Sequence, residues 1–411
     1  MARGGGRASR SPLRPDIAAF ARLTGWGYFP VAFVGRLPFA MMVVGVLTVV
    51  ATTRGSVADA GVAAALAGVG TAICGPLAGA LADRHGQRVV LLGASAASIL
   101  AAAGLLALLS ADASIAAVCA TTFVLGGATP QVAPFSRSRL AGFATRARSP
   151  ERRSRATSLV MSYESVVDEA SFVIGPVLVG LLTTLIAPWA PLVIASAISA
   201  VVVTAFALHP SALAASRPHS PPPAGRPFTA RVVVLAAAML LVGGMFGSVI
   251  TALTGFMDER GQTGQAGVVY GAMSVGAIAV AVGVAALPAR FTLMARWAAF
   301  GAVAIAGSVV LAAASTVPGA VVGLFLSGAG VGAVLVALFS LGERAAPAGR
   351  TTTVLTTLQS TLVLGQAAAT AGCGMLVQAS GAGAGYAVTV GLAVILTALA
   401  LAVGAVSRAR A

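Results

Sequence analysis

Long apolar segments alternate with short charged or Pro/Gly-rich segments from near the start of the chain to its end. A helix needs about 20 mostly apolar residues to cross a bilayer, and it must form all of its backbone hydrogen bonds internally. Twelve segments have this character, at residues 29–52, 57–82, 88–110, 113–136, 157–182, 188–208, 231–256, 264–288, 293–314, 317–341, 351–378 and 384–406. The pattern predicts an all-α membrane protein with twelve transmembrane helices.

The twelve predicted spans fall into two groups of six. The stretch between the sixth and seventh spans contains RPHSPPPAGRPF, whose prolines cannot continue a helix and are typical of a linker. We therefore expect a cytoplasmic tail over residues 1–28, a six-helix bundle over 29–208, a cytoplasmic linker over 209–230 and a second six-helix bundle over 231–411.

Composition agrees with lipid as the main solvent. Hydrophobic residues make up 58% of the chain and charged residues only 9%, whereas a soluble domain carries about a quarter charged residues. All 26 basic residues are arginines, and alanine and glycine abound, which is typical of GC-rich coding and indicates a bacterial source.

The net charge of +15 reports membrane orientation. The arginines lie mainly in short loops between apolar spans, so we expect no nucleic-acid partner. All except Arg36, Arg54 and Arg260 fall on one side of the predicted bundle, with residues 137–155 among the loops there. By the positive-inside rule that side faces the cytoplasm. The pattern predicts a multi-pass protein of the inner (cytoplasmic) membrane with both termini in the cytoplasm.

The loop after the second span reads Gly79-Ala-Leu81-Ala-Asp83-Arg84-His-Gly86-Gln-Arg88. It resembles the motif G-x-L-x-D-R-x-G-R-R of the major facilitator superfamily, with a glutamine in place of one basic residue. The resemblance implies two six-helix bundles that alternate in access, a latch between them at this loop, and a monomer. Asp83 can accept hydrogen bonds from helix-terminal NH groups or pair with Arg84 or Arg88.

The fifth span carries Gly175-Pro176-Val-Leu-Val-Gly180, which is similar to the G-P-x-x-G-G segment of antiporters in this superfamily. The R-x-x-Q-G element that many proton-coupled exporters have in the fourth span is missing, and the second loop motif, near residues 287–290, is degenerate. The resemblance implies proton-coupled efflux of a small molecule. Proton-symport uptake and a non-transporting sensor or scaffold stay open as alternatives.

Ionisable residues inside spans are costly and tend to mark functional sites. Four lie deep within the predicted spans, Arg36, Glu164, Asp168 and Glu169. Glu164 and Asp168 are four residues apart and share one helix face, while Glu169 points about 100° away from Asp168. We expect Arg36 to pair with Glu164 or Asp168. The pair either releases a carboxylate that takes up a proton in another transport state or locks the first and fifth helices together permanently.

Five further polar residues are candidates for a substrate cavity or, alternatively, for helix packing, and they are Gln131, Tyr163, Tyr270, Gln359 and Gln366. The three cysteines lie singly in apolar segments and the three histidines lie in loops, so we expect no metal site. No catalytic motif or nucleotide-binding P-loop occurs, so we expect neither enzymatic activity nor a cofactor. The expected partners are a small-molecule substrate, protons and the lipid bilayer.

Overall fold

The computed structural model describes residues 24–144, 150–212, 228–262, 266–284, 287–288 and 291–409. Throughout these residues the regular structure is helical, and no strand occurs among them. The predicted tail up to residue 23, the centre of the predicted linker at residues 213–227 and part of the degenerate second motif at residues 289–290 lie outside the described residues.

Helices of the first half form six apolar columns. They are α2 (Tyr28–Val34) with α3 (Leu37–Arg54), α4 (Val57–His85), α5 (Gln87–Ser110), α6 (Ile115–Ala128) with α7 (Val132–Ala144), α8 (Pro150–Leu185), and α9 (Ala190–Ile198) with the π-helical η1 (Ser199–Val203) and α10 (Thr204–Leu208). The first, fourth and sixth columns are therefore each made of more than one helix.

The second half contains six unbroken helices. They are α12 (Ala230–Asp258), α13 (Ala266–Val284), α14 (Leu293–Ala312), α15 (Val317–Ala345), α16 (Thr351–Ser380) and α17 (Ala382–Ala409). In the described part of the chain, eleven columns are long and apolar enough to cross a membrane, and the shorter apolar helix over residues 266–281 completes the predicted set of twelve. The all-α, twelve-helix prediction is confirmed.

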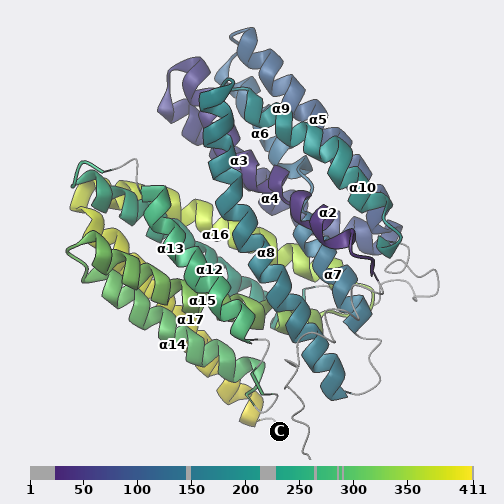
Figure 1. The fold of residues 1–411 in the computed structure, drawn as a ribbon, viewed down its shortest axis with the longest axis vertical. Coiled ribbons are helices and arrows are strands. Elements are labelled where there is room, and N and C mark those ends of the chain that lie inside the picture. Colours follow the sequence, from purple (N-terminus) through teal and green to yellow (C-terminus); the bar gives the residue numbers. More distant parts are fainter. Residues whose placement is uncertain are drawn as a thin grey trace, which may run out of the picture.

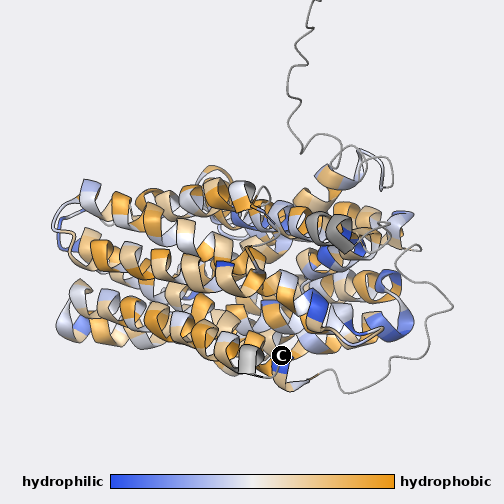
Figure 2. Ribbon diagram, turned by 90° about the horizontal axis from the view of Figure 1, so that it is seen from below, coloured by the Kyte–Doolittle hydropathy of each residue, from blue (hydrophilic) through white to orange (hydrophobic). Residues whose placement is uncertain are grey.

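The two halves form separate bundles, α2 to α10 and α12 to α17 (Figure 1). The main contacts between them are α16 packed along α4, α13 and α15 packed on α8, and α16 packed on α7. We call the end where α4 joins α5 and α15 joins α16 the basic end, and the other the opposite end. In Figure 2 the helices are mostly hydrophobic and hydrophilic residues gather toward one end of the bundle.

Two of the breaks meet inside the first bundle. The first column is interrupted at Gly35 and Arg36, and the fourth at Pro130, whose ring cannot continue the helix. A Cβ on Gly35 would lie 3.5 Å from the side chain of Val132, so the two breaks are neighbours. Non-helical backbone at membrane depth is tolerated where it is buried in protein or lines a cavity. The two breaks therefore indicate either close packing within the protein or a cavity at this place.

The prediction that residues 137–155 form a loop is wrong. Helix α7 continues to Ala144 and α8 begins at Pro150, with residues 145–149 outside the described part. Arg137 and Arg139 lie on α7 and are each only 1% exposed. The arginines suggested the end of a span because burying an unpaired charge is costly. In the structure, specific partners of Arg137 and Arg139 offset that cost.

Candidate functional site

A cluster of charged side chains lies in the interior, where the first, fourth and fifth columns meet. Arg36 sits at the break between α2 and α3, and Glu164 and Asp168 lie one turn apart on α8. The Arg36 guanidinium pairs with Glu164 through Nη2, and its Nε lies 2.9 Å from Oδ1 of Asp168. All three residues are buried. Arg36 thus binds both acids at once.

Arg137 is a second cation in this cluster, and sequence reasoning missed it. Its Nη2 pairs with Asp168, and its Nη1 donates a hydrogen bond of 3.2 Å to Oε1 of Gln359 on α16. Its guanidinium carbon lies 3.5 Å from the centroid of the Phe339 ring on α15. Since α15 and α16 belong to the second bundle, Arg137 connects the two halves.

We call Arg36, Arg137, Glu164 and Asp168 the ion-pair cluster. Its two positive and two negative charges cancel, as an interior site requires. Three acids but only one arginine lie deep within the predicted spans, and this imbalance is the signal in the sequence that could have pointed to a further buried cation. The position of Arg137 beyond a proline break hid it, because the apolar segment ends there.

Hydrogen bonds from uncharged side chains hold the cluster in place. The Ser136 hydroxyl donates to Oε1 of Glu164 at 2.7 Å, and the Tyr28 hydroxyl lies 2.8 Å from the Ser136 hydroxyl. Tyr163 hydrogen-bonds Arg36, and its ring packs edge-on against Phe29 at 5.3 Å between centroids. Glu164 is completely inaccessible to solvent and is positioned by Arg36, at the break before α3, and by Ser136 on α7. This geometry fixes the Glu164 carboxyl group in one orientation toward Arg36.

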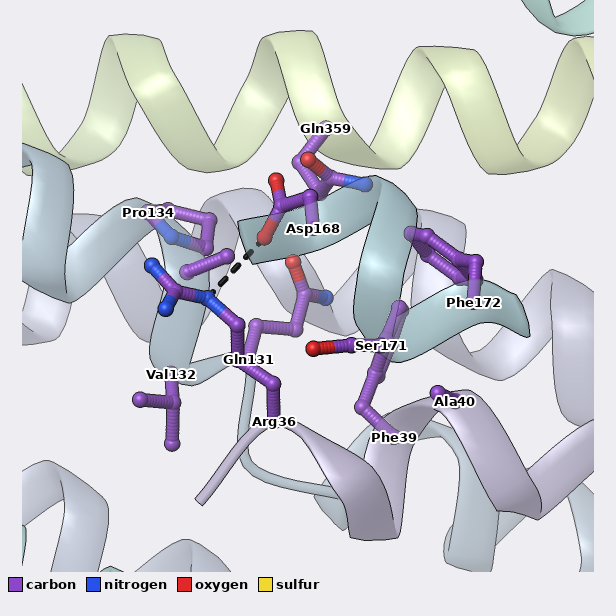
Figure 3. A pocket seen from close by; sticks show the side chains of 11 residues that line it. Arg36, Phe39, Ala40, Gln131, Val132, Pro134, Asp168, Ser171, Phe172 and Gln359 are labelled. Carbon is purple, nitrogen blue, oxygen red and sulfur yellow. Dashed lines mark ion pairs between the residues drawn. The ribbon is translucent and has the colours of Figure 1, made fainter. Parts of the chain in front are cut away.

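A small cavity borders the cluster (Figure 3). Arg36 and Asp168 form its charged wall, and Phe39 and Phe172, whose rings meet edge to face at 6.3 Å, lie opposite. The other lining residues are Ala40, Gln131, Val132, Ala133, Pro134, Ser171 and Gln359. Gln359 comes from the second bundle, so both halves contribute to the cavity.

Two of the five predicted cavity residues line this space, Gln131 and Gln359. Gln131 lies at the break of the fourth column and is 7% exposed, and its side-chain carbonyl has no hydrogen-bond partner among the described residues. A buried carbonyl without a partner is costly, so it can accept a hydrogen bond from a ligand. Tyr163, Tyr270 and Gln366 do not line this cavity.

Glu169 points away from the ion-pair cluster and toward the second bundle. Its carboxyl group hydrogen-bonds with the hydroxyl of Ser274 on α13, and Tyr270 of the same helix lies close enough for electrostatic contact. Glu169 is 9% exposed and Ser274 is 6% exposed. The structure thus separates the three predicted acids of α8, Glu164, Asp168 and Glu169, into a paired set and a single residue at the interface of the halves.

The loop motif after α4 joins the two halves at the basic end. Asp83 accepts hydrogen bonds from the backbone NH groups of Thr352 and Thr353, at 3.1 and 2.7 Å, and from the Thr353 hydroxyl at 2.7 Å. It thereby caps the N-terminus of α16, where negative charge is favourable. Within the described residues no ion pair joins Asp83 to Arg84 or Arg88, and both arginine side chains are exposed.

Glycines of α4 permit close contact with α16. A Cβ on Gly79 would lie 2.1 Å from the Thr356 hydroxyl and 2.9 Å from the Thr352 carbonyl oxygen. Gly86 lies at the turn between α4 and α5 and has a φ of +90°, a backbone conformation that residues other than glycine rarely adopt. Both glycines of the motif therefore have a packing or turn requirement.

Gln87, which replaces a basic residue of the motif, is buried and well bonded. Its Oε1 accepts from Nε of Arg139 at 2.7 Å, and its Nε2 donates to the hydroxyls of Ser138 at 2.6 Å and Thr352 at 3.4 Å. Arg139 also donates to the Phe206 carbonyl. The cation at this place is thus supplied by α7 instead of by the loop.

The fifth-helix motif has one tightly packed member. A Cβ on Gly175 would lie 2.7 Å from Cβ of Ala40 and 2.9 Å from its carbonyl carbon, so Gly175 lets α8 approach α3 beside the cavity. Pro176 lies within α8. A Cβ on Gly180 would meet nothing within 4 Å.

Comparison with known proteins places this architecture. The family model of the Major Facilitator Superfamily matches residues 28–370. No curated protein matches the sequence. The fold is similar to the crystal structure of the human organic anion transporter MFSD10 (TETRAN), at 19% identity and a TM-score of 0.68, over 95% of this chain and all of that one.

Two further solved structures are similar. One is a bacterial homologue of the iron transporter ferroportin in an outward-facing state, at 15% identity, a TM-score of 0.69 and coverage of 91% and 97% of the two chains. The other is the E. coli fucose:proton symporter FucP, at 15% identity, a TM-score of 0.64 and coverage of 90% and 97%. Identities this low show a shared fold. With its family match and its two bundles of helices, the chain belongs to the major facilitator superfamily.

Proposed function

We propose that this protein is a secondary active transporter that exports a small molecule across the cytoplasmic membrane by alternating access, coupled to proton movement. The observation that carries the proposal is the cavity between the two halves, lined by Arg36 and Asp168 from one bundle and by Gln359 from the other. A ligand bound there touches both moving bodies, so its binding can bias their relative position.

The basic end is the cytoplasmic end in this proposal, because arginines in short loops are retained there. Asp83 joins the halves at that end. We therefore assign the structure to the state that is closed toward the cytoplasm. In the transport cycle the Asp83 contacts break, the halves rock, and the cavity opens to the basic end.

The cavity favours a ligand with an apolar body and a hydrogen-bond donor. Phe39 and Phe172 offer aromatic surface, while the free carbonyl of Gln131 and the partly accessible carboxylate of Asp168, whose side chain is 11% exposed, offer acceptors. Export is the proposed direction because the Gly175 and Pro176 segment is similar to that of antiporters. This sequence motif supports the direction of transport, and a measurement of the direction of flux decides between export and uptake.

The test is accumulation of a panel of lipophilic dyes and antibiotics in efflux-deficient bacterial cells. Cells carry the wild type, Glu164→Gln, Asp168→Asn, the matched acid-to-amide control Asp112→Asn, or an empty vector, at equal membrane levels. Asp112 is suitable because its side chain is 97% exposed. We expect lower accumulation with the wild type and the control, abolished by an uncoupler and by either change in the cluster.

Two results would contradict the proposal. Higher accumulation with the wild type than with the empty vector would reverse the direction and favour proton-symport uptake. Equal accumulation of every compound, with the protein present in the membrane, would contradict export of this class of molecule.

A further inference from the structure

We propose that Glu169, and not an acid of the ion-pair cluster, is the proton-binding group, and that its protonation is linked to the contact between α8 and α13. This inference rests on the proposed proton coupling and names the site that carries it. The argument starts from the position of Glu169 between the two halves, and then considers its charged neighbours.

Glu169 is buried where the halves pack. It follows Asp168 on α8, but the helical rotation of about 100° per residue turns its side chain away from the ion-pair cluster. It meets Ser274 through a hydrogen bond and lies near Tyr270, both on α13 of the second bundle. Relative motion of the halves must therefore change the surroundings of this carboxyl group.

No described cation pairs with Glu169. Arg36, at the break before α3, and Arg137, on α7, are directed at Glu164 and Asp168. The nearest charged group on its own helix is Asp168, which repels a second negative charge. The ionisable residues on the other helices packed against α8 are Tyr28 on α2, Arg54 on α3, Arg139 on α7, Tyr270 on α13, and Glu343 and Arg344 near the basic end of α15.

The energetic consequence follows from charge burial. An ionised carboxylate held in the interior without a cation is strongly destabilising, whereas a neutral acid keeps its hydrogen bond to Ser274 at little cost. Packing of α8 against α13 and protonation of Glu169 therefore favour each other. When the halves rock apart at this point, water can reach the carboxyl group, which then ionises and releases its proton. Binding and release of one proton are thus tied to the conformational change.

The ion-pair cluster is unsuited to that task. Each of its acids is matched by an arginine, so protonation of Glu164 or Asp168 would leave an unbalanced positive charge in the interior. Asp168 contacts both arginines and Glu164 also accepts from Ser136. We assign the cluster to positioning the first, fourth and fifth columns around the cavity, and the proton to Glu169.

The test measures the distance between the halves without a substrate. Spin labels are attached at Ala111→Cys and Gln262→Cys, which are exposed at the opposite end on the first and second bundle, in full-length protein whose three native cysteines are replaced by alanine. The protein is reconstituted in lipid nanodiscs, and the distance distribution is measured by electron spin resonance from about pH 5 to about pH 9. The variants are Glu169→Gln, Glu169→Asp and His209→Gln.

We expect the labelled parent to populate longer distances at low pH, since a neutral Glu169 stabilises the state closed at the basic end. Glu169→Gln mimics the neutral acid and should hold the low-pH distribution at every pH, while Glu169→Asp should keep the shift. His209 is the matched control, because burial and the nearby Arg139 lower its pKa, and because its aromatic contact is with Tyr28 of the first bundle. His209→Gln should also keep the shift.

The inference is overturned if Glu169→Gln retains the pH-dependent shift, or if the parent shows no shift. Transport separates this failure from failure of the proposed function. If Glu169→Gln still exports as the wild type does, and an uncoupler still abolishes that export, the role of Glu169 is overturned and export stands. A pH shift that depends on Glu169, in a protein that exports none of the panel, overturns export and leaves the proton site standing.

Discussion

Asp168 forms ion pairs with two arginines, and this arrangement determines how much stability is lost when any member of the ion-pair cluster is replaced. Arg36 and Arg137 approach its carboxylate from different columns, and Glu164 balances the remaining positive charge. Removing one partner leaves an uncompensated buried charge, which typically destabilises a protein by about 3–5 kcal/mol. Removing one cation and one anion together restores the balance. The cluster should therefore behave as one electrostatic unit.

We predict that Arg137→Gln and Asp168→Asn each lower the thermal unfolding midpoint of the detergent-solubilised protein, and that the double variant loses less than the sum of the two. The exposed acid-to-amide change Asp112→Asn should leave the midpoint unchanged. Thermal unfolding followed by intrinsic fluorescence measures all four proteins. Strictly additive losses would contradict an electrostatic unit, because coupled residues give non-additive effects.

At the scale of helices, the closure that we propose at the basic end rests on the contact between α4 and α16. Gly79 and Asp83 lie one turn apart on α4, the first allowing close approach and the second capping α16. A side chain at position 79 would meet the backbone of residues 352 and 353, which cannot rotate aside. The contact is therefore sensitive to one added side chain.

We predict that Gly79→Val separates the halves at the basic end. Labels at His85→Cys and Ala348→Cys, exposed on α4 and in the loop before α16, should move to longer distances. Gly93→Val is the matched control, because a Cβ at Gly93 would meet nothing within 4 Å. An unchanged distance in Gly79→Val, in protein that remains folded, would show that this contact does not hold the basic end closed.

The number and order of the helices could be predicted because each span must be long and apolar by itself. The broken fourth column could not, since the partners that stabilise Arg137 come from α8, α15 and α16, far away in the sequence. The expected pairing partners of Arg36 share a face of α8, and helical spacing indicated this. The different surroundings of Glu169 depend on how the second bundle packs against α8. The periodicity of a single helix gives no information about that packing.

At the scale of the whole molecule, the two bundles share a cavity, a latch at the basic end and a buried acid at their interface. Gln359 brings the second bundle to the cavity, Asp83 brings the first bundle to α16, and Glu169 meets α13. Each of these contacts joins one bundle to the other, so one rocking motion of the halves changes all three together. In the transport cycle that we propose, substrate binding, closure and proton binding are thereby linked.

The most direct test of proton-coupled export uses inside-out membrane vesicles that contain the wild type or Glu169→Gln. Respiration acidifies the vesicle interior, a fluorescent amine reports the pH gradient, and a compound that the wild type excludes from cells is then added. We predict that the compound partly collapses the gradient in wild-type vesicles, because protons leave as it enters, and has no effect with Glu169→Gln. A gradient that the compound leaves unchanged in wild-type vesicles would contradict proton-coupled export.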